Sequence, residues 1–179
     1  MPAKKISITL LFGLIAALCI IGFVCGTWLA GPEAFIGPTV WLGRCLVILI
    51  AAVAATVRKR ANGGIIDFRS ALRTAYGVMV MAIIAESLCV WLIPNVIDPH
   101  FNQRLVPFIM AKAEKWDRQL GASDAIIRAD ADDIRKNNQF SVGALIMGTG
   151  RQLLMFGIIA ILIAVTVRSK KGPAPKPES

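Results

Sequence analysis

Three charged side chains lie within long apolar stretches of this 179-residue sequence: Arg44, Glu86 and Arg151. A charge at mid-membrane costs at least about 2.5–3.5 kcal/mol on insertion scales, so such groups usually face the interior of a helical bundle and pair there. Paired with one or both arginines, Glu86 would form an ion pair that fixes helix register. It could instead be the titratable member of a proton or anion site, or the arginines could extend to the outer interface.

The depths of these residues indicate a common level. At a rise of 1.5 Å per residue, Arg44 lies about 7 Å and Glu86 about 10 Å from the outer ends of their stretches. Arg151 shares the outer half of the membrane if its stretch enters near Gly148. We therefore predict a candidate intramembrane charge cluster of Arg44, Glu86 and Arg151.

Other chemistry finds little support in the sequence. His100 is the single histidine, so most acid–base and metal mechanisms lack their usual residue. An EF-hand counted from Asp130 would need glycine at its sixth position and glutamate at its twelfth, where Arg135 and Ser141 stand. All four cysteines lie within apolar stretches and not in loops: Cys19, Cys25, Cys45 and Cys89. We expect no enzyme, and no catalytic, cofactor-binding or metal site.

Four apolar stretches must position the charged residues. The chain is 56% hydrophobic with a mean hydropathy of +0.65, too apolar for a soluble domain. A helix of about 20 residues crosses the hydrocarbon core, and the first stretch exceeds the about 7–15 apolar residues of a signal peptide. We predict an all-α integral membrane protein, a single domain over 1–179, with four transmembrane helices at about 6–29, 39–57, 75–93 and 144–167.

The segment 94–140 between spans three and four predicts a helical hairpin insert. Asp98-Pro99 combines a capping acid with a proline at the first helical position. Gly121 is a natural stop for that helix, and Ser123 can begin a second one. Apolar and amphipathic residues recur at helical spacing along the first helix: Leu105, Phe108, Ile109, Lys112, Trp116 and Leu120.

Charge predicts the orientation. The segments around 1–5, 58–73 and 168–179 hold eleven basic residues and two acids, whereas 94–140 holds seven of each and 30–38 has no Lys or Arg. The positive-inside rule places both termini in the cytoplasm of a bacterial inner membrane and the insert in the periplasm, with 169–179 as a flexible cytoplasmic tail. The basic clusters would contact anionic lipid headgroups, and no nucleic-acid partner is expected.

Shorter motifs refine this arrangement. Asn62-Gly63-Gly64 predicts a tight turn, and Asp67 a helix N-cap leading into the third span. Gly22 and Gly26 form a GxxxG motif, typical of close helix contact either within a bundle or between copies of a protein.

The order of these features resembles a known family. The basic turn with Asn62-Gly63-Gly64, then Ile66-Asp67-Phe68-Arg69-Ser70-Ala71-Leu72, a third span and Ile97-Asp98-Pro99-His100-Phe101 is similar to an uncharacterised family of four-helix membrane proteins in Bacteroidetes, a domain of unknown function (DUF4199-like). The resemblance implies an inner-membrane location and no assigned activity. We expect a structural or interaction subunit that contacts other membrane proteins or a second copy of itself. The alternative is a small transporter or proton-linked component that uses the Glu/Arg cluster.

Overall fold

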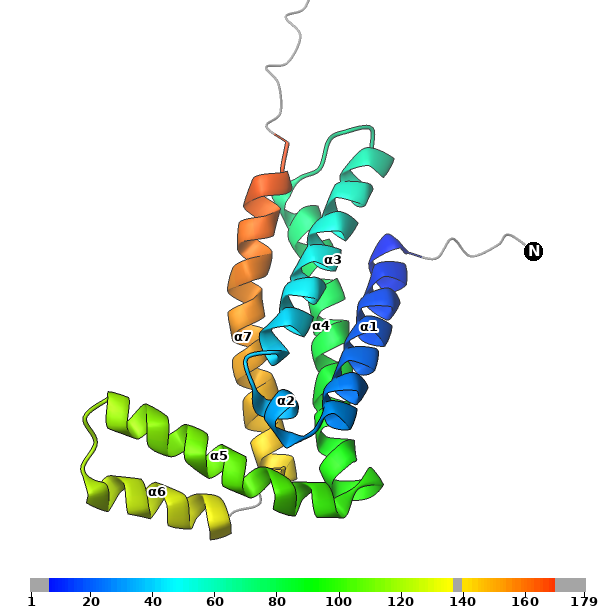
Figure 1. Ribbon diagram of the computed structural model, residues 1–179. Helices are drawn as coiled ribbons and strands as arrows, with labels where there is room; N and C mark the ends of the chain where they lie inside the picture. Colours follow the sequence, from blue (N-terminus) through cyan, green and yellow to red (C-terminus); the bar gives the residue numbers. More distant parts are fainter. Residues whose placement is uncertain (1–6, 137–139, 170–179) are drawn as a thin grey trace, which may run out of the picture.

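The computed structural model describes residues 7–136 and 140–169, and all regular structure within them is helical (Figure 1). The predicted tail at 169–179 lies outside the described residues except for Ser169, as do the lysines near both termini. Four helices are long and apolar enough to cross a membrane. They are α1 (Ile8–Ala30), α3 (Val40–Ala61), α4 (Phe68–Leu92) and α7 (Val142–Val167). The predicted fold class is confirmed, since all four expected spans form helices.

Helix α4 is the centre of the bundle and packs against α1, α3 and α7. Its buried face repeats every three or four residues, and half of it is Ala or Thr: Ala71, Thr74, Ala75, Val78, Met79, Ala82, Ile83 and Glu86. The facing side of α3 contributes Ala51, Ala54 and Ala55, each with no exposed surface. Small residues let membrane helices approach closely, where van der Waals packing takes the place of the hydrophobic effect.

At one end of the bundle, which we call the closed end, hydrogen bonds join Ser169, just after α7, to the turn between α3 and α4. The start of α1, the turn between α3 and α4 and the end of α7 all lie at this end (Figure 1). Gly63 and Gly64 adopt φ of 71° and 84°, as the turn motif predicts, and the Asp67 carboxylate caps α4 by accepting a hydrogen bond from the Ser70 amide at 3.0 Å. Ser169 then donates from its hydroxyl to Gly64 O at 2.9 Å and from its amide to Ile66 O at 3.1 Å.

Shorter helices lie at the opposite end, which we call the open end. Helix α2 (Pro32–Ile36) follows α1, and a π-helical turn η1 (Ile93–Ile97) extends α4. Neither was expected from the sequence. Phe35 of α2 meets Phe101 edge to face, with ring centroids 5.2 Å apart. The Asn95 amide donates to Phe140 O at 3.1 Å and so holds the segment that enters α7 against η1.

The predicted helical insert is present as α5 (Pro99–Gln119) and α6 (Asp124–Lys136), and it runs sideways from the bundle (Figure 1). Asp98 caps α5 through the Phe101 amide at 3.1 Å, and Gly121 adopts a φ of 76° in the turn between the two helices. Helix α5 packs against α2 and η1, and α6 packs against α5.

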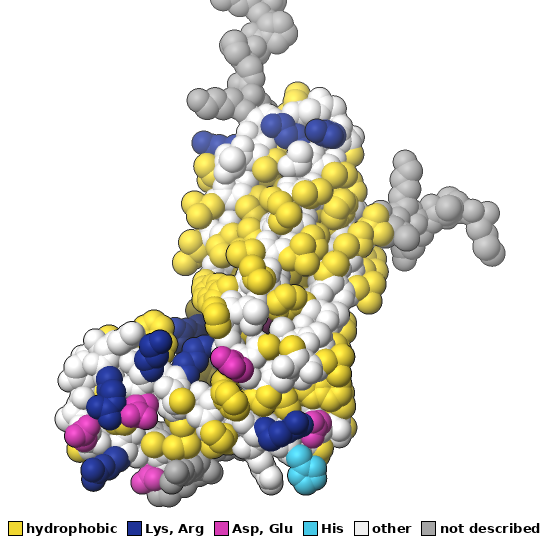
Figure 2. All heavy atoms as spheres, in the orientation of Figure 1, with side chains coloured by type: hydrophobic (Ala, Val, Ile, Leu, Met, Phe, Trp, Pro, Cys, Tyr) yellow, Lys and Arg dark blue, Asp and Glu magenta, His cyan; other side chains and the backbone are white. Residues whose placement is uncertain are grey.

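The sides of the bundle are covered with exposed apolar residues, whereas charged side chains gather at its two ends and on the hairpin (Figure 2). Leu18, Leu154 and Ile158 are 69%, 77% and 64% exposed. An apolar girdle of this kind matches the hydrocarbon of a bilayer.

Candidate functional site

Arg44 and Glu86 meet near the open end of the bundle. Arg44 lies one turn after the start of α3, on the face that buries Val47 and Ala51 further along, and Glu86 lies on the buried face of α4. Arg44 Nη2 stands 3.4 Å from Glu86 Oε1. That separation is longer than the about 2.7–2.9 Å of a strong charge-assisted hydrogen bond, so Coulomb attraction provides most of the interaction.

The second carboxylate oxygen of Glu86 is held by α7. Gln152 Nε2 donates to Glu86 Oε2 at 2.6 Å. Glu86 is the one charged residue among the buried described residues, at 7% exposure, and both of its oxygens have partners. This matches the cost of burying a carboxylate, which requires pairing and hydrogen bonds.

Arg151, the third member of the predicted cluster, is exposed and lies outside this site. Neighbouring residues of an α-helix point about 100° apart, so when Gln152 faces Glu86 the Arg151 side chain faces away. No hydrogen bond or ion pair of Arg151 is found within residues 7–136 and 140–169. The structure thus brings Arg44 and Glu86 together as predicted, whereas the α7 residue that contacts Glu86 is Gln152 and not its neighbour Arg151.

Two hydroxyl groups lie beside Arg44, Glu86 and Gln152, and we call these polar side chains together the polar layer. Thr149, one turn before Gln152, donates to the Ser87 hydroxyl at 2.8 Å. Gln152, Thr149 and Ser87 were not predicted as site residues, because uncharged polar side chains cost less to bury than charged ones and are common in membrane helices. The spacing of Thr149 and Gln152, three residues apart on one helix face, was the available signal.

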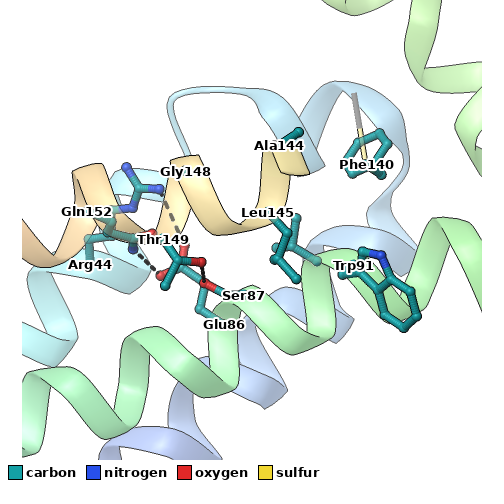
Figure 3. Close-up of a pocket in the computed structure, with 11 residues that line it drawn as sticks. Arg44, Glu86, Ser87, Trp91, Phe140, Ala144, Leu145, Gly148, Thr149 and Gln152 are labelled. Carbon is teal, nitrogen blue, oxygen red and sulfur yellow. Dashed lines mark hydrogen bonds and ion pairs between the residues drawn. The ribbon is translucent and has the colours of Figure 1, made fainter. Parts of the chain in front are cut away.

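A cavity of about 230 Å³ opens beside this layer, between α3, α4 and α7. Polar side chains gather at one end of the cavity and apolar ones, including Trp91, Leu145 and Phe140, at the other (Figure 3). Figure 3 also shows the ion pair and the hydroxyl pair side by side, at the polar end. The site therefore has two chemically distinct halves.

Arg44 keeps hydrogen-bonding capacity beyond Glu86. Its guanidinium carbon lies 5.3 Å from the centroid of the Trp41 ring, a cation–π contact. Its Nε is buried and has no hydrogen-bond partner among the described residues. A buried donor without a partner is costly and uncommon. The rest of the Arg44 guanidinium lines the cavity in a side chain that is 24% exposed, so the site still offers a donor on a cation, whereas the Glu86 carboxylate is occupied.

No group of three or more His, Cys, Asp or Glu side chains that could hold a metal ion occurs in the part of the chain that the structure describes. The chemistry that the geometry does support is electrostatic: a paired charge, neutral hydroxyl and amide groups, and one available donor beside a cavity.

Comparison with known proteins gives one match. The model of a family described as "Protein of unknown function (DUF4199)" matches residues 7–169. No curated protein and no solved structure matches.

Proposed function

Starting from the fact that this chain belongs to the DUF4199 family, a family of unknown function, we propose that it is a non-enzymatic interaction subunit of a membrane assembly. The docking element is the α5–α6 hairpin, and the partner is a second membrane protein whose outer segment lies beside the bundle. The single observation that carries this proposal is a helical hairpin that projects sideways from a four-helix membrane bundle (Figure 1).

Several contacts hold α5 and α6 together and attach the hairpin to the bundle. Residues of α5 and α6 face each other along its length, among them Met110, Ala113, Ile127 and Ile134. Arg118 joins the two helices at their turn, with 3.0 Å to Glu114 and 3.9 Å to Asp124. Within α5, the Lys112 ammonium donates to Ile36 O at 2.7 Å and ties the helix to α2. A pre-ordered element loses less conformational entropy on binding than a flexible loop.

The hairpin also exposes large apolar side chains. Trp116 of α5 is 58% exposed, Leu120 directly after α5 is 78% exposed, and Ile126 of α6 is 52% exposed. Aromatic residues are enriched in protein interfaces and charged ones depleted at their centres. Such a surface suits a neighbouring protein better than it suits bulk water.

The proposal includes the location: a bacterial inner membrane with both termini in the cytoplasm and the hairpin in the periplasm. Basic residues support it, because Arg58, Lys59 and Arg60 end α3 at the closed end of the bundle, whereas Ala30–Pro38 at the open end has no Lys or Arg. Lys and Arg accumulate in cytoplasmic loops.

Photocrosslinking in native membranes tests the docking role. A photoreactive amino acid at Trp116 should give a specific adduct with a second protein, and that protein should co-purify in mild detergent. The matched control is Leu49 of α3, which is 61% exposed on the side of the bundle. Adducts at Leu49 with none at Trp116, or recovery of the protein alone, would contradict docking through the hairpin.

A second candidate, a small proton-linked membrane component, rests on Glu86. This residue is a buried carboxylate beside a cavity, and titratable groups in such positions often act in proton pathways. Glu86→Gln should then abolish a proton-linked flux measured in liposomes with a pH-sensitive dye. A flux that survives the substitution rules this candidate out.

A further inference from the structure

We propose that the cavity binds the headgroup of an anionic phospholipid, with Arg44 as the donor to its phosphate and one acyl chain in an apolar groove between α4 and α7. This inference does not depend on docking through the hairpin. It follows from the chemistry of the cavity, from its depth and from the groove beside it.

The unused donor determines the ligand chemistry. Arg44 lines the cavity with a side chain that is 24% exposed, and its one hydrogen bond among the described residues goes to Glu86, both of whose oxygens are engaged. The cavity therefore calls for a hydrogen-bond acceptor. A phosphate oxygen satisfies a guanidinium donor well because the bond is charge-assisted.

The depth of the cavity matches a lipid headgroup. Arg44 lies about 6 Å along α3 from its first residue, at 1.5 Å per residue. Trp41 stacks beside Arg44, and Trp91 lines the cavity from α4. Tryptophan gathers at the level of the headgroups in membrane proteins. At about 230 Å³ the cavity is smaller than the about 300–1,000 Å³ of pockets that enclose whole drug-sized ligands, which suits a headgroup alone.

The apolar groove between α4 and α7 is the proposed binding place of the acyl chain. A space of about 390 Å³ runs along the α4–α7 seam and is lined almost entirely by apolar side chains, including Ile84, Leu88, Ile146 and Leu153. It shares Ser87, Leu145 and Thr149 with the cavity, so the two spaces adjoin across the seam. On both helices the groove is offset from the cavity by only one to three residues toward the membrane centre, so the two spaces lie side by side at nearly the same depth. The proposed lipid places its phosphate in the cavity and one chain in the groove beside it.

The groove variant Gly150→Phe provides the most direct test. Gly150 lines the groove, and no atom lies within 4 Å of a Cβ added there, so a side chain can start at this position without a clash at Cβ and a phenylalanine ring would fill part of the groove. Gly26→Phe on α1 is the matched control, because Gly26 is also an exposed helical glycine with the same free space. Arg44→Lys tests the headgroup end and keeps the charge opposite Glu86.

The measurement is native mass spectrometry of the delipidated full chain titrated with phosphatidylglycerol, with phosphatidylcholine and with inorganic phosphate. We expect one phosphatidylglycerol per chain, bound about tenfold more weakly by Gly150→Phe and by Arg44→Lys, as expected from the loss of one charge-assisted hydrogen bond or the equivalent apolar contact. Gly26→Phe should bind as the unmodified chain does. Equal binding by Gly150→Phe, or equal affinity for phosphatidylcholine, overturns the proposal. Binding of inorganic phosphate as tightly as the lipid would make this a site for free anions and would also overturn it.

Discussion

At the scale of single residues, Glu86 is the position on which the polar layer depends. It receives Arg44 from α3 and Gln152 from α7, so one carboxylate joins three membrane helices. Removing one member of a buried pair leaves the other charge unpaired in a medium of low dielectric constant. The pair therefore fixes how α3, α4 and α7 are aligned along the membrane normal.

Glu86→Gln should lower the free energy of unfolding by about 1–3 kcal/mol. This is less than the about 3–5 kcal/mol typical of a broken buried pair, because the Arg44 side chain is 24% exposed and can regain some solvation. Thermal unfolding of the purified protein in detergent would show the effect as a lower Tm.

Arg151→Gln is the control for that experiment. Arg151 is exposed and has no partner among the described residues, so its replacement should leave Tm nearly unchanged. If both variants lose the same stability, the ion pair does not determine the packing of the bundle.

The contrast between Gln152 and Arg151 shows how far sequence reasoning reaches at a site. The depth of a residue in the membrane could be predicted, because the ends of the apolar stretches fix it to within about a turn, or about 5.4 Å. The rotation of α7 about its own axis could not be predicted. Apolar residues occupy both the buried face of α7, with Phe156 and Ala160, and its exposed face, with Leu154 and Ile158, so no stripe marks the side that meets α4.

At the scale of the helices, glycines with different surroundings have different roles. A Cβ added at Gly43 of α3 would lie 2.6 Å from Phe23 Cδ1 and 3.0 Å from Ile20 Cδ1, both on α1. An aromatic ring cannot yield as a flexible chain end can, so Gly43 is required where α1 and α3 cross. The GxxxG pair Gly22 and Gly26 has open space instead, so it makes no close contact within the bundle.

Gly43→Ala should therefore destabilise the protein by about 1–3 kcal/mol, as overpacking does. Gly26→Ala should be neutral or stabilise it by about 0.5–1 kcal/mol, because alanine favours a helix over glycine. Paired Tm measurements on the two variants check the difference. Equal shifts would show that α1 and α3 can separate without cost.

The capping residues explain which helix boundaries could be predicted. Asp67 and Asp98 each accept a hydrogen bond from the third following amide, at 3.0 Å and 3.1 Å, and these contacts follow from local sequence alone. Helix α2 was missed because five residues are too few to show a period. It is held by tertiary contact, through Phe35 against Phe101, which the local sequence does not contain.

At the scale of the whole molecule, the two ends differ in charge and in closure. The closed end carries the basic turn between α3 and α4, and the open end carries the hairpin. Cysteines introduced at Asn62 and Ala129, both exposed positions, should report these two sides separately. In a chain whose native cysteines are replaced by serine, an impermeant maleimide applied to intact cells should label position 129 and not position 62. The reverse pattern would invert the proposed orientation.

The ion pair also has a consequence for how the chain enters the membrane. Arg44 and Glu86 lie on α3 and α4, which are consecutive and joined by a short turn, so each charge arrives at the translocation machinery with its counter-ion on the adjoining helix. Isolated α4 should insert less efficiently than the α3–α4 pair in a glycosylation-mapping assay, since an unpaired acid within a membrane span is costly to insert. Equal efficiencies would contradict this. Gln152 is synthesised later, so insertion would begin with the Arg44–Glu86 charges already neutralised, and α7 would complete the site.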